Sequence, residues 1–130
     1  MKETLQFLKD AGTFYLATVD GDQPRVRPFG AVVEFEGKLY IVTNNQKDVY
    51  KQMQKNPKIE ISGMAKGKWI RLSGEAVRDD RFEARKAMLD ENPSLRNMYS
   101  EDDGKVEVFY LQNATASICS FTDEPVTYSF

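Results

Sequence analysis

Short strand-like runs separated by turn residues recur along most of this chain. The run at 13–19 ends at Asp20-Gly21-Asp22, and two further runs at 24–35 and 38–43 are divided by Glu36-Gly37. Alternation of apolar and polar residues with a period of two is typical of strands, and glycine beside an acidic residue is typical of tight reversals. We therefore predict that these three runs form an antiparallel meander.

The rest of the chain continues this pattern and leaves room only for short helices. Apolar residues recur three and four apart in three segments, which predicts helices at 2–11, 46–55 and about 79–92. Further strands are predicted at 58–64, 68–78, 106–111 and 114–121. Six or seven short antiparallel strands with few helices favour a closed or partly open barrel. The chain is thus expected to form one mainly β domain, 1–130, with short helices.

The composition excludes several kinds of chemistry. The chain contains no histidine, which removes the Ser-His-Asp triad, the Cys-His pair and the His-containing zinc sites. Its single cysteine, Cys119, excludes an intramolecular disulfide and is expected to pack in a strand. Any catalysis is therefore expected to depend on a cofactor.

Charge and hydropathy restrict the possible partners. The formal net charge is −2, whereas general nucleic-acid binding needs a basic face. No apolar run approaches the length of a membrane span, and the first residues lack the apolar centre of a signal peptide. We expect a cytoplasmic protein with neither a nucleic-acid nor a membrane partner. Apolar residues on both faces of some strands suggest that a second copy covers one outer face.

Two arginines lie two residues apart on the second predicted strand. Arg25 and Arg27 therefore project from the same face, and Pro28, which has no backbone N–H, marks an edge or a bulge. Charged residues on an edge strand are an ordinary protection against aggregation, and this is the simplest interpretation of the motif taken alone.

The stretch TNNQK, residues 43–47, lies between the third predicted strand and the second predicted helix. Thr and Asn cap helices, so a capped helix with an exposed Lys47 explains the stretch by itself. Neighbouring strands in a meander would, however, bring Arg27 to the same end of the barrel. The cations of Arg27 and Lys47, the hydroxyl of Thr43 and free helix N–H groups would suit a phosphate dianion there.

The sequence leaves open the roles of three aromatic residues and one glycine. Trp69 is equally compatible with a core or interface position and with stacking on a ligand. Tyr128 and Phe130 belong to a tail that either frays or covers a partner's site. Gly74, in the middle of a predicted strand, is typical of a bulge or a barrel corner.

Four stretches occur together in a definite order. They are Arg27-Pro28-Phe29 after an Asp-Gly hairpin, YIVTNNQK at 40–47, KNPKIEI at 55–61 and WIRLSGEA at 69–76. In this combination the chain resembles the pyridoxamine 5'-phosphate oxidase-like family of FMN-binding split β-barrels, which are antiparallel and Greek-key-like. The closest resemblance is to the short members described as general stress or nitroimidazole-resistance-like proteins.

The resemblance implies a homodimer that binds two molecules of flavin mononucleotide (FMN) in clefts between its subunits. The family's phosphate-binding arginine matches Arg27. Its polar phosphate loop matches Thr43, Asn44 and Lys47. The resemblance therefore implies the same phosphate site as the convergence of charges described above.

Further contacts to the flavin are implied by the same resemblance. The backbone around Pro28, Phe29 and Gly30 would follow the edge of the isoalloxazine ring. Trp69 would reach the flavin from the second subunit. Arg25 has no firm counterpart in the family, and it would lie either at the phosphate or in the dimer interface.

The implied reaction is less specific than the implied cofactor. The true oxidases carry a C-terminal tryptophan and arginine that hold the vitamin substrate, and the nitroimidazole reductases use a histidine; neither feature occurs in this sequence. We expect a flavin-dependent reductase that takes hydride from NADH or NADPH and acts on an unidentified small molecule. The alternatives are a non-catalytic flavin, deazaflavin or haem binding or sensor module, and an oligonucleotide binder, which the acidic charge disfavours.

Overall fold

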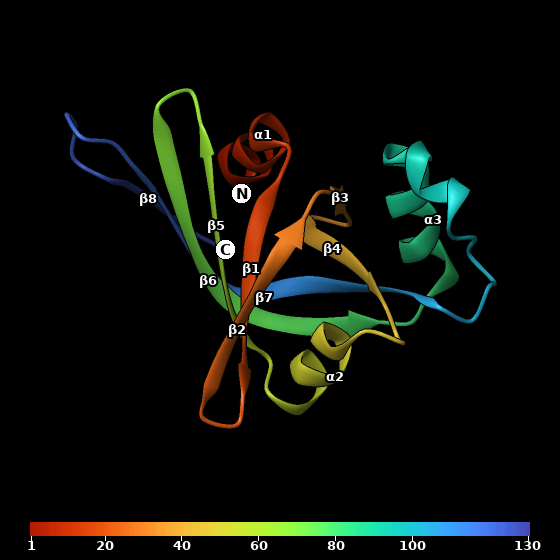
Figure 1. Ribbon diagram of the computed structural model, residues 1–130. Coiled ribbons are helices and arrows are strands. Elements are labelled where there is room, and N and C mark those ends of the chain that lie inside the picture. Colours follow the sequence, from red (N-terminus) through yellow and green to blue (C-terminus); the bar gives the residue numbers. More distant parts are fainter.

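The computed structural model describes all 130 residues as one eight-stranded sheet with three α-helices and one 3₁₀ helix (Figure 1). The strands are β1 Phe14–Asp20, β2 Gln23–Phe29, β3 Val32–Phe35, β4 Lys38–Asn44, β5 Lys58–Ala65, β6 Lys68–Asp79, β7 Val106–Cys119 and β8 Val126–Ser129. The helices are α1 Lys2–Ala11, α2 Asp48–Lys55, α3 Phe82–Glu91 and the 3₁₀ helix η1 Pro93–Asn97.

The sheet is antiparallel throughout and open. Its order is β2-β1-β5-β6-β7-β4-β3, with β8 added to β7. β2 and β3 form the two ends of this path and do not pair with each other. The prediction of a mainly β, antiparallel and split barrel is therefore confirmed.

The predicted three-stranded meander is wrong. The run at 24–35 is divided into β2 and β3, with β2 paired to β1 and β3 paired to β4. The alternation of exposed and partly buried residues in β2 ends at Gly30, and the next three residues, Ala31, Val32 and Val33, are all buried. Successive side chains of a strand point to opposite faces, so a single strand with one buried face would not bury all three. Consequently β2 and β4 are not neighbours, and only the curvature of the open sheet brings them to one cavity.

The C-terminal third is more continuous than predicted. The runs at 106–111 and 114–121 belong to one long strand, β7, whose left-handed residue Asn113 (φ 52°) lies where the register to β6 shifts. The shift falls at Gly74, which confirms the predicted bulge. The tail forms β8 on β7, and the backbone N–H of Phe130 donates to Ala114 of its own chain at 2.9 Å.

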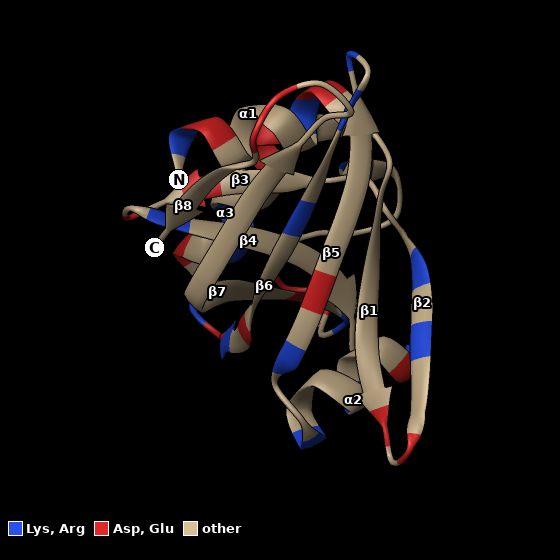
Figure 2. Ribbon diagram, turned by 90° about the vertical axis from the view of Figure 1, so that its left-hand side faces the viewer, with Lys and Arg blue, Asp and Glu red and all other residues tan.

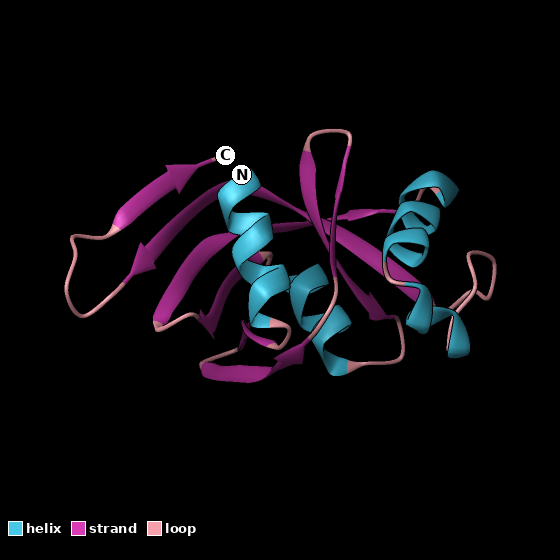
Figure 3. Cartoon of the chain, turned by 90° about the horizontal axis from the view of Figure 1, so that it is seen from above, coloured by secondary structure: helices cyan, strands magenta, loops and turns pink.

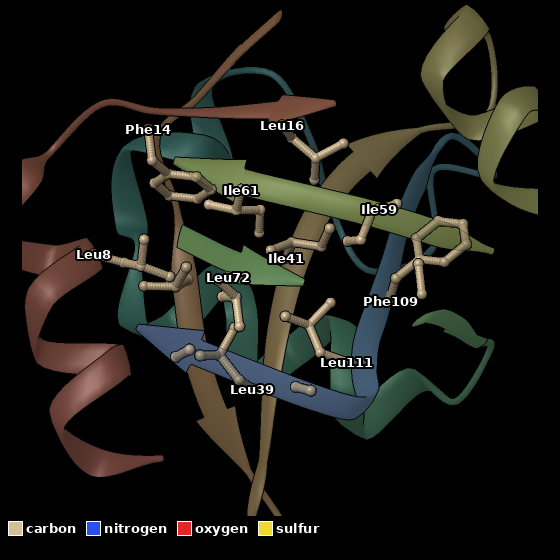
Figure 4. Close-up of a cluster of buried hydrophobic side chains, with 14 of the residues drawn as sticks. Leu8, Phe14, Leu16, Leu39, Ile41, Ile59, Ile61, Leu72, Phe109 and Leu111 are labelled. Carbon is tan, nitrogen blue, oxygen red and sulfur yellow. The ribbon is translucent and has the colours of Figure 1, made fainter. Parts of the chain in front are cut away.

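The main core lies between α1, α2 and the concave face of the sheet. Fully buried side chains such as Leu8, Phe14, Leu16, Ile61 and Phe109 meet there (Figure 4). Each such side chain contributes about 1.5–3 kcal/mol of burial free energy. A smaller cluster packs α3 on the sheet, and its buried members are Ala31, Val33, Tyr40, Ala84, Met88 and Val108.

The three α-helices lie at different edges of the barrel. Figure 1 shows α1 and α2 near opposite ends of the sheet, and in the view from above α3 and η1 stand apart from both (Figure 3). Gly12 ends α1 at φ 74°, and its N–H donates to the carbonyl of Leu8. No helix has both the length and the apolar character that crossing a membrane requires.

Candidate functional site

A cavity of about 320 Å³ opens between the end of β2, the end of β4 and η1. Six of the residues that the sequence predicted at the flavin line it: Arg27, Pro28, Phe29, Gly30, Thr43 and Lys47. The other lining residues are Ala31, Val42, Val49, Asn92, Ser94, Leu95, Met98 and Tyr99. The two motifs, which begin 16 positions apart at Arg27 and Thr43, therefore meet, although their strands are not neighbours.

Arg27 is held beside this cavity by groups that carry no charge. Because Arg27 pairs with Leu16 across the β1–β2 ladder, its side chain lies on the concave face of the sheet. Its Nη1 donates to the carbonyl of Leu16 at 3.2 Å and to the hydroxyl of Thr18 at 2.8 Å. Its Nη2 donates to Oε1 of Gln52, on α2, at 2.7 Å. The two basic positions of β2 lie close to α2 in Figure 2.

No carboxylate lies within ion-pair distance of Arg27. Five of the seven arginines have a carboxylate oxygen within 4.0 Å, and Arg27 and Arg85 do not. Burial lowers the pKa of Arg27, with a further lowering from Arg25 and an opposing rise from Asp48. A guanidinium in this environment gains electrostatic energy when an anion binds.

The second half of the site is the junction between β4 and α2. Thr43 is 5% exposed, and its Oγ1 is a buried oxygen without a hydrogen-bond partner. Such an atom costs about 1–3 kcal/mol unless something binds it. Lys47 precedes α2, makes no ion pair and lies where the helix N-terminus favours anions.

Hydrogen bonds fix the loop between these two residues. Asn44 accepts from the backbone N–H of Gln46 at 3.0 Å and donates to the hydroxyl of Tyr99 at 2.8 Å. Asn45 donates to Glu107 at 3.1 Å, and Glu107 in turn pairs with Arg78 at 2.8 Å. Asn44 thus supports the cavity wall through Tyr99 and is not itself in the lining.

The wall formed by η1 was not predicted. The sequence predicted only a helix that ends at about residue 92, and it gave no signal for contacts that the following residues make with β4. Asn92 joins this wall to the sheet because its Nδ2 donates to the carbonyl of Val32 at 3.1 Å. Leu95 and Met98 supply apolar surface, while Ser94 and Tyr99 supply hydroxyl groups.

An ion-paired network fastens α3, and with it η1, to the sheet. The hydroxyl of the fully buried Tyr40 donates to Asp79 at 2.7 Å. Arg81 pairs with Asp79 at 2.9 Å and with Glu36 at 2.7 Å. Hydrogen bonding from Arg81 lowers the pKa of Asp79 to about 2, and burial raises the pKa of Tyr40.

Besides Asn44, two predicted residues lie outside the cavity lining. Arg25 shares the concave face with Arg27 but pairs with Asp20 at 3.1 Å. Trp69 lies on the opposite, convex face, where its ring centroid is 5.0 Å from that of Phe121. Within one chain, therefore, Trp69 does not contribute to this cavity.

Comparison with known proteins confirms the resemblance. The family model described as pyridoxamine 5'-phosphate oxidase matches residues 1–117. A search of curated protein sequences found no match. Among solved structures, a NimC/NimA family protein from Clostridium acetobutylicum has 59% sequence identity and a TM-score of 0.98, with 100% of this chain and 92% of that chain covered.

More distant structures share the fold. A haem-binding protein from Mycobacterium smegmatis has 15% identity and a TM-score of 0.76, with coverage of 95% of this chain and 55% of that chain. A pyridoxamine 5'-phosphate oxidase-related, FMN-binding protein from Nostoc punctiforme has 17% identity and a TM-score of 0.64, with coverage of 99% and 93%. Because the family model spans residues 1–117 of 130, the chain belongs to the pyridoxamine 5'-phosphate oxidase family.

Proposed function

We propose that the protein binds FMN noncovalently, with the phosphate between Arg27, Thr43 and Lys47. One observation carries this proposal: a guanidinium and an ammonium group, both without an ion pair, and a buried hydroxyl without a partner line the same cavity. A phosphate dianion accepts hydrogen bonds from all three and is attracted by both charges. The donor set fits this cofactor, and the FMN-binding relative from Nostoc punctiforme supports the choice.

Part of the flavin would be held by a second copy of the chain. A cavity of about 320 Å³ is at the small end of the range for ligand sites, so one subunit would enclose only part of FMN. Arg27 and the β4–α2 junction would hold the phosphate end. The partner would then supply the remaining wall, which is the role predicted for Trp69.

The convex face of the sheet supports this dimer. Large apolar side chains lie exposed there, with Tyr15 at 51%, Val26 at 67% and Met64 at 66%. Phe121, beside Trp69, is 89% exposed. Figure 2 shows only scattered charges along β1, β5 and β6. Exposed large apolar side chains on one face of a sheet, here beside the exposed pair Arg71–Glu60, are typical of an interface.

The reaction that we propose is reduction of a small molecule by an FMN-dependent oxidoreductase. A bound flavin supplies the redox chemistry itself, so the chain needs no histidine or other side-chain base. Its residues would bind the phosphate, exclude water and position the ring. The alternative is a non-catalytic flavin, deazaflavin or haem carrier or sensor, for which the haem-binding relative gives a precedent.

Titration with FMN tests the binding proposal. The purified protein should take up FMN with a change in flavin absorbance and fluorescence. Arg27→Ala should weaken binding about ten- to hundredfold, because it removes a charge-assisted contact of about 1.5–3 kcal/mol. Arg25→Ala is the matched control on the same strand face, and it should leave binding within about threefold if Arg25 does not reach the phosphate. A wild-type protein that binds no FMN would refute the proposal.

Two further measurements test the dimer and the reaction. Sedimentation at micromolar concentration should give a dimer, and a monomer that binds FMN tightly would contradict the shared site. Anaerobic stopped-flow reduction with NADH and NADPH should be faster than reduction of free FMN. If neither nicotinamide reduces the bound flavin faster, the carrier alternative replaces the oxidoreductase.

A further inference from the structure

Gln52 contacts Arg27 from outside the cavity and is not part of its lining. We propose that Gln52, together with Thr18, positions the Arg27 guanidinium and, because both side chains are uncharged, leaves its charge available to an anionic ligand. Gln52 would thereby determine the preference for a phosphorylated over an unphosphorylated flavin. This inference rests on the FMN site proposed above.

The three side chains form a closed triangle of hydrogen bonds. Arg27 donates to the hydroxyl of Thr18 at 2.8 Å and to Oε1 of Gln52 at 2.7 Å. The Thr18 hydroxyl donates its own proton to the same Oε1. The amide of Gln52 must present its oxygen here, since its nitrogen would place a donor against the guanidinium of Arg27, which can only donate. The orientation of all three groups is therefore determined by the triangle.

The triangle leaves part of the guanidinium free. A guanidinium has five N–H donors, and Arg27 uses three of them on Leu16, Thr18 and Gln52. The Nε–H and one hydrogen of Nη2 make no hydrogen bond within the chain. Two donors are enough for the bidentate contact that arginine makes with phosphate. Gln52 thus restricts the rotamer of Arg27 without using all of its donors.

The lack of charge at position 52 is the feature that matters. Two other arginines that bridge elements are paired with carboxylates, Arg78 with Glu107 and Arg81 with Glu36, whereas Arg85 donates to backbone carbonyls. A glutamate at position 52 would have nearly the same shape as glutamine but would form an ion pair with Arg27. That internal carboxylate would compete with phosphate for the same cation.

The decisive experiment compares FMN with riboflavin, which lacks the phosphate. Dissociation constants for both are measured by fluorescence titration for wild type, Gln52→Glu and Gln54→Glu. Gln54 is exposed on the same helix, so its replacement makes the same change of charge without touching Arg27. Gln52→Glu should weaken FMN binding at least tenfold and leave riboflavin binding within about twofold, whereas Gln54→Glu should change neither.

A second variant separates positioning from folding. Gln52→Met keeps the length of the side chain but removes the acceptor, and it should weaken FMN at least threefold with riboflavin again unchanged. If Gln52→Glu does not fold, as judged by circular dichroism, Gln52→Met decides. The inference is overturned if the folded variants retain the wild-type ratio of FMN to riboflavin affinity. A wild-type protein that binds neither flavin instead refutes the proposed function, independently of Gln52.

Discussion

Arg27 and Arg81 anchor two sides of the same cavity through partners of opposite character. Arg81 is half exposed but bound to two carboxylates, those of Asp79 and Glu36. Arg27 is more buried and is bound only to neutral oxygens. A cation whose charge is balanced within the chain stabilises the fold, whereas a cation with only neutral partners retains its attraction for a ligand. The difference assigns a structural role to one arginine and a binding role to the other.

The largest loss of stability is expected when the ion-paired network around Arg81 is broken. Asp79→Ala should lower the free energy of unfolding by about 2–3 kcal/mol, because the fully buried Tyr40 hydroxyl and Arg81 both lose their acceptor. Urea denaturation measures this value. Glu36→Ala is the control, since it breaks only the exposed pair with Arg81 and should cost less than about 1 kcal/mol. If Asp79→Ala and Glu36→Ala lowered the free energy of unfolding equally, the structural role assigned to Arg81 would be contradicted.

A somewhat smaller loss of stability is expected when the pH is lowered. The pKa of Asp79 is about 2 in the folded chain and 3.8 ordinarily, so the folded state prefers the charged carboxylate. The resulting stabilisation of about 2 kcal/mol is present above about pH 4 and is lost as the pH falls toward about 2. Urea denaturation at several pH values should therefore show a steeper loss for wild type than for Asp79→Asn. Parallel curves for the two proteins would contradict the assignment.

Local sequence motifs predicted a large part of the fold and of the site. Alternation and turn residues identified most strands, the three helices and the bulge at Gly74. The arginine-proline motif and the strand–helix junction identified Arg27, Thr43 and Lys47, which the structure brings to one cavity. These signals are local because strand pairing, capping and turns depend on residues close in sequence.

Long-range contacts could not be predicted in the same way. The meander was wrong because the break at Gly30 sends the chain to the other end of the sheet, and no local preference encodes that route. Tyr99 follows a 3₁₀ helix, and its contact with Asn44 spans 55 residues. Gln52 looked like an ordinary polar residue on a helix, and only its distance to Arg27 distinguishes it.

The smallest effect on stability is expected at Thr43, where binding and stability should change in opposite directions. Thr43→Val replaces the partnerless hydroxyl with a methyl group of similar size, which should raise the free energy of unfolding by about 1 kcal/mol. The same change should weaken FMN binding about five- to tenfold, because one hydrogen bond to the phosphate is lost. Urea denaturation and fluorescence titration measure the two quantities.

Thr4 provides the matched control for this prediction. Its Oγ1 is also buried without a partner, but it lies in α1 and away from the cavity. Thr4→Val should therefore stabilise the protein by a similar amount and leave the affinity for FMN unchanged. If both variants stabilise the fold and neither affects FMN, the Thr43 hydroxyl is a packing defect rather than a phosphate ligand. If only Thr43→Val weakens binding, the unsatisfied oxygen is kept for the ligand at the expense of stability.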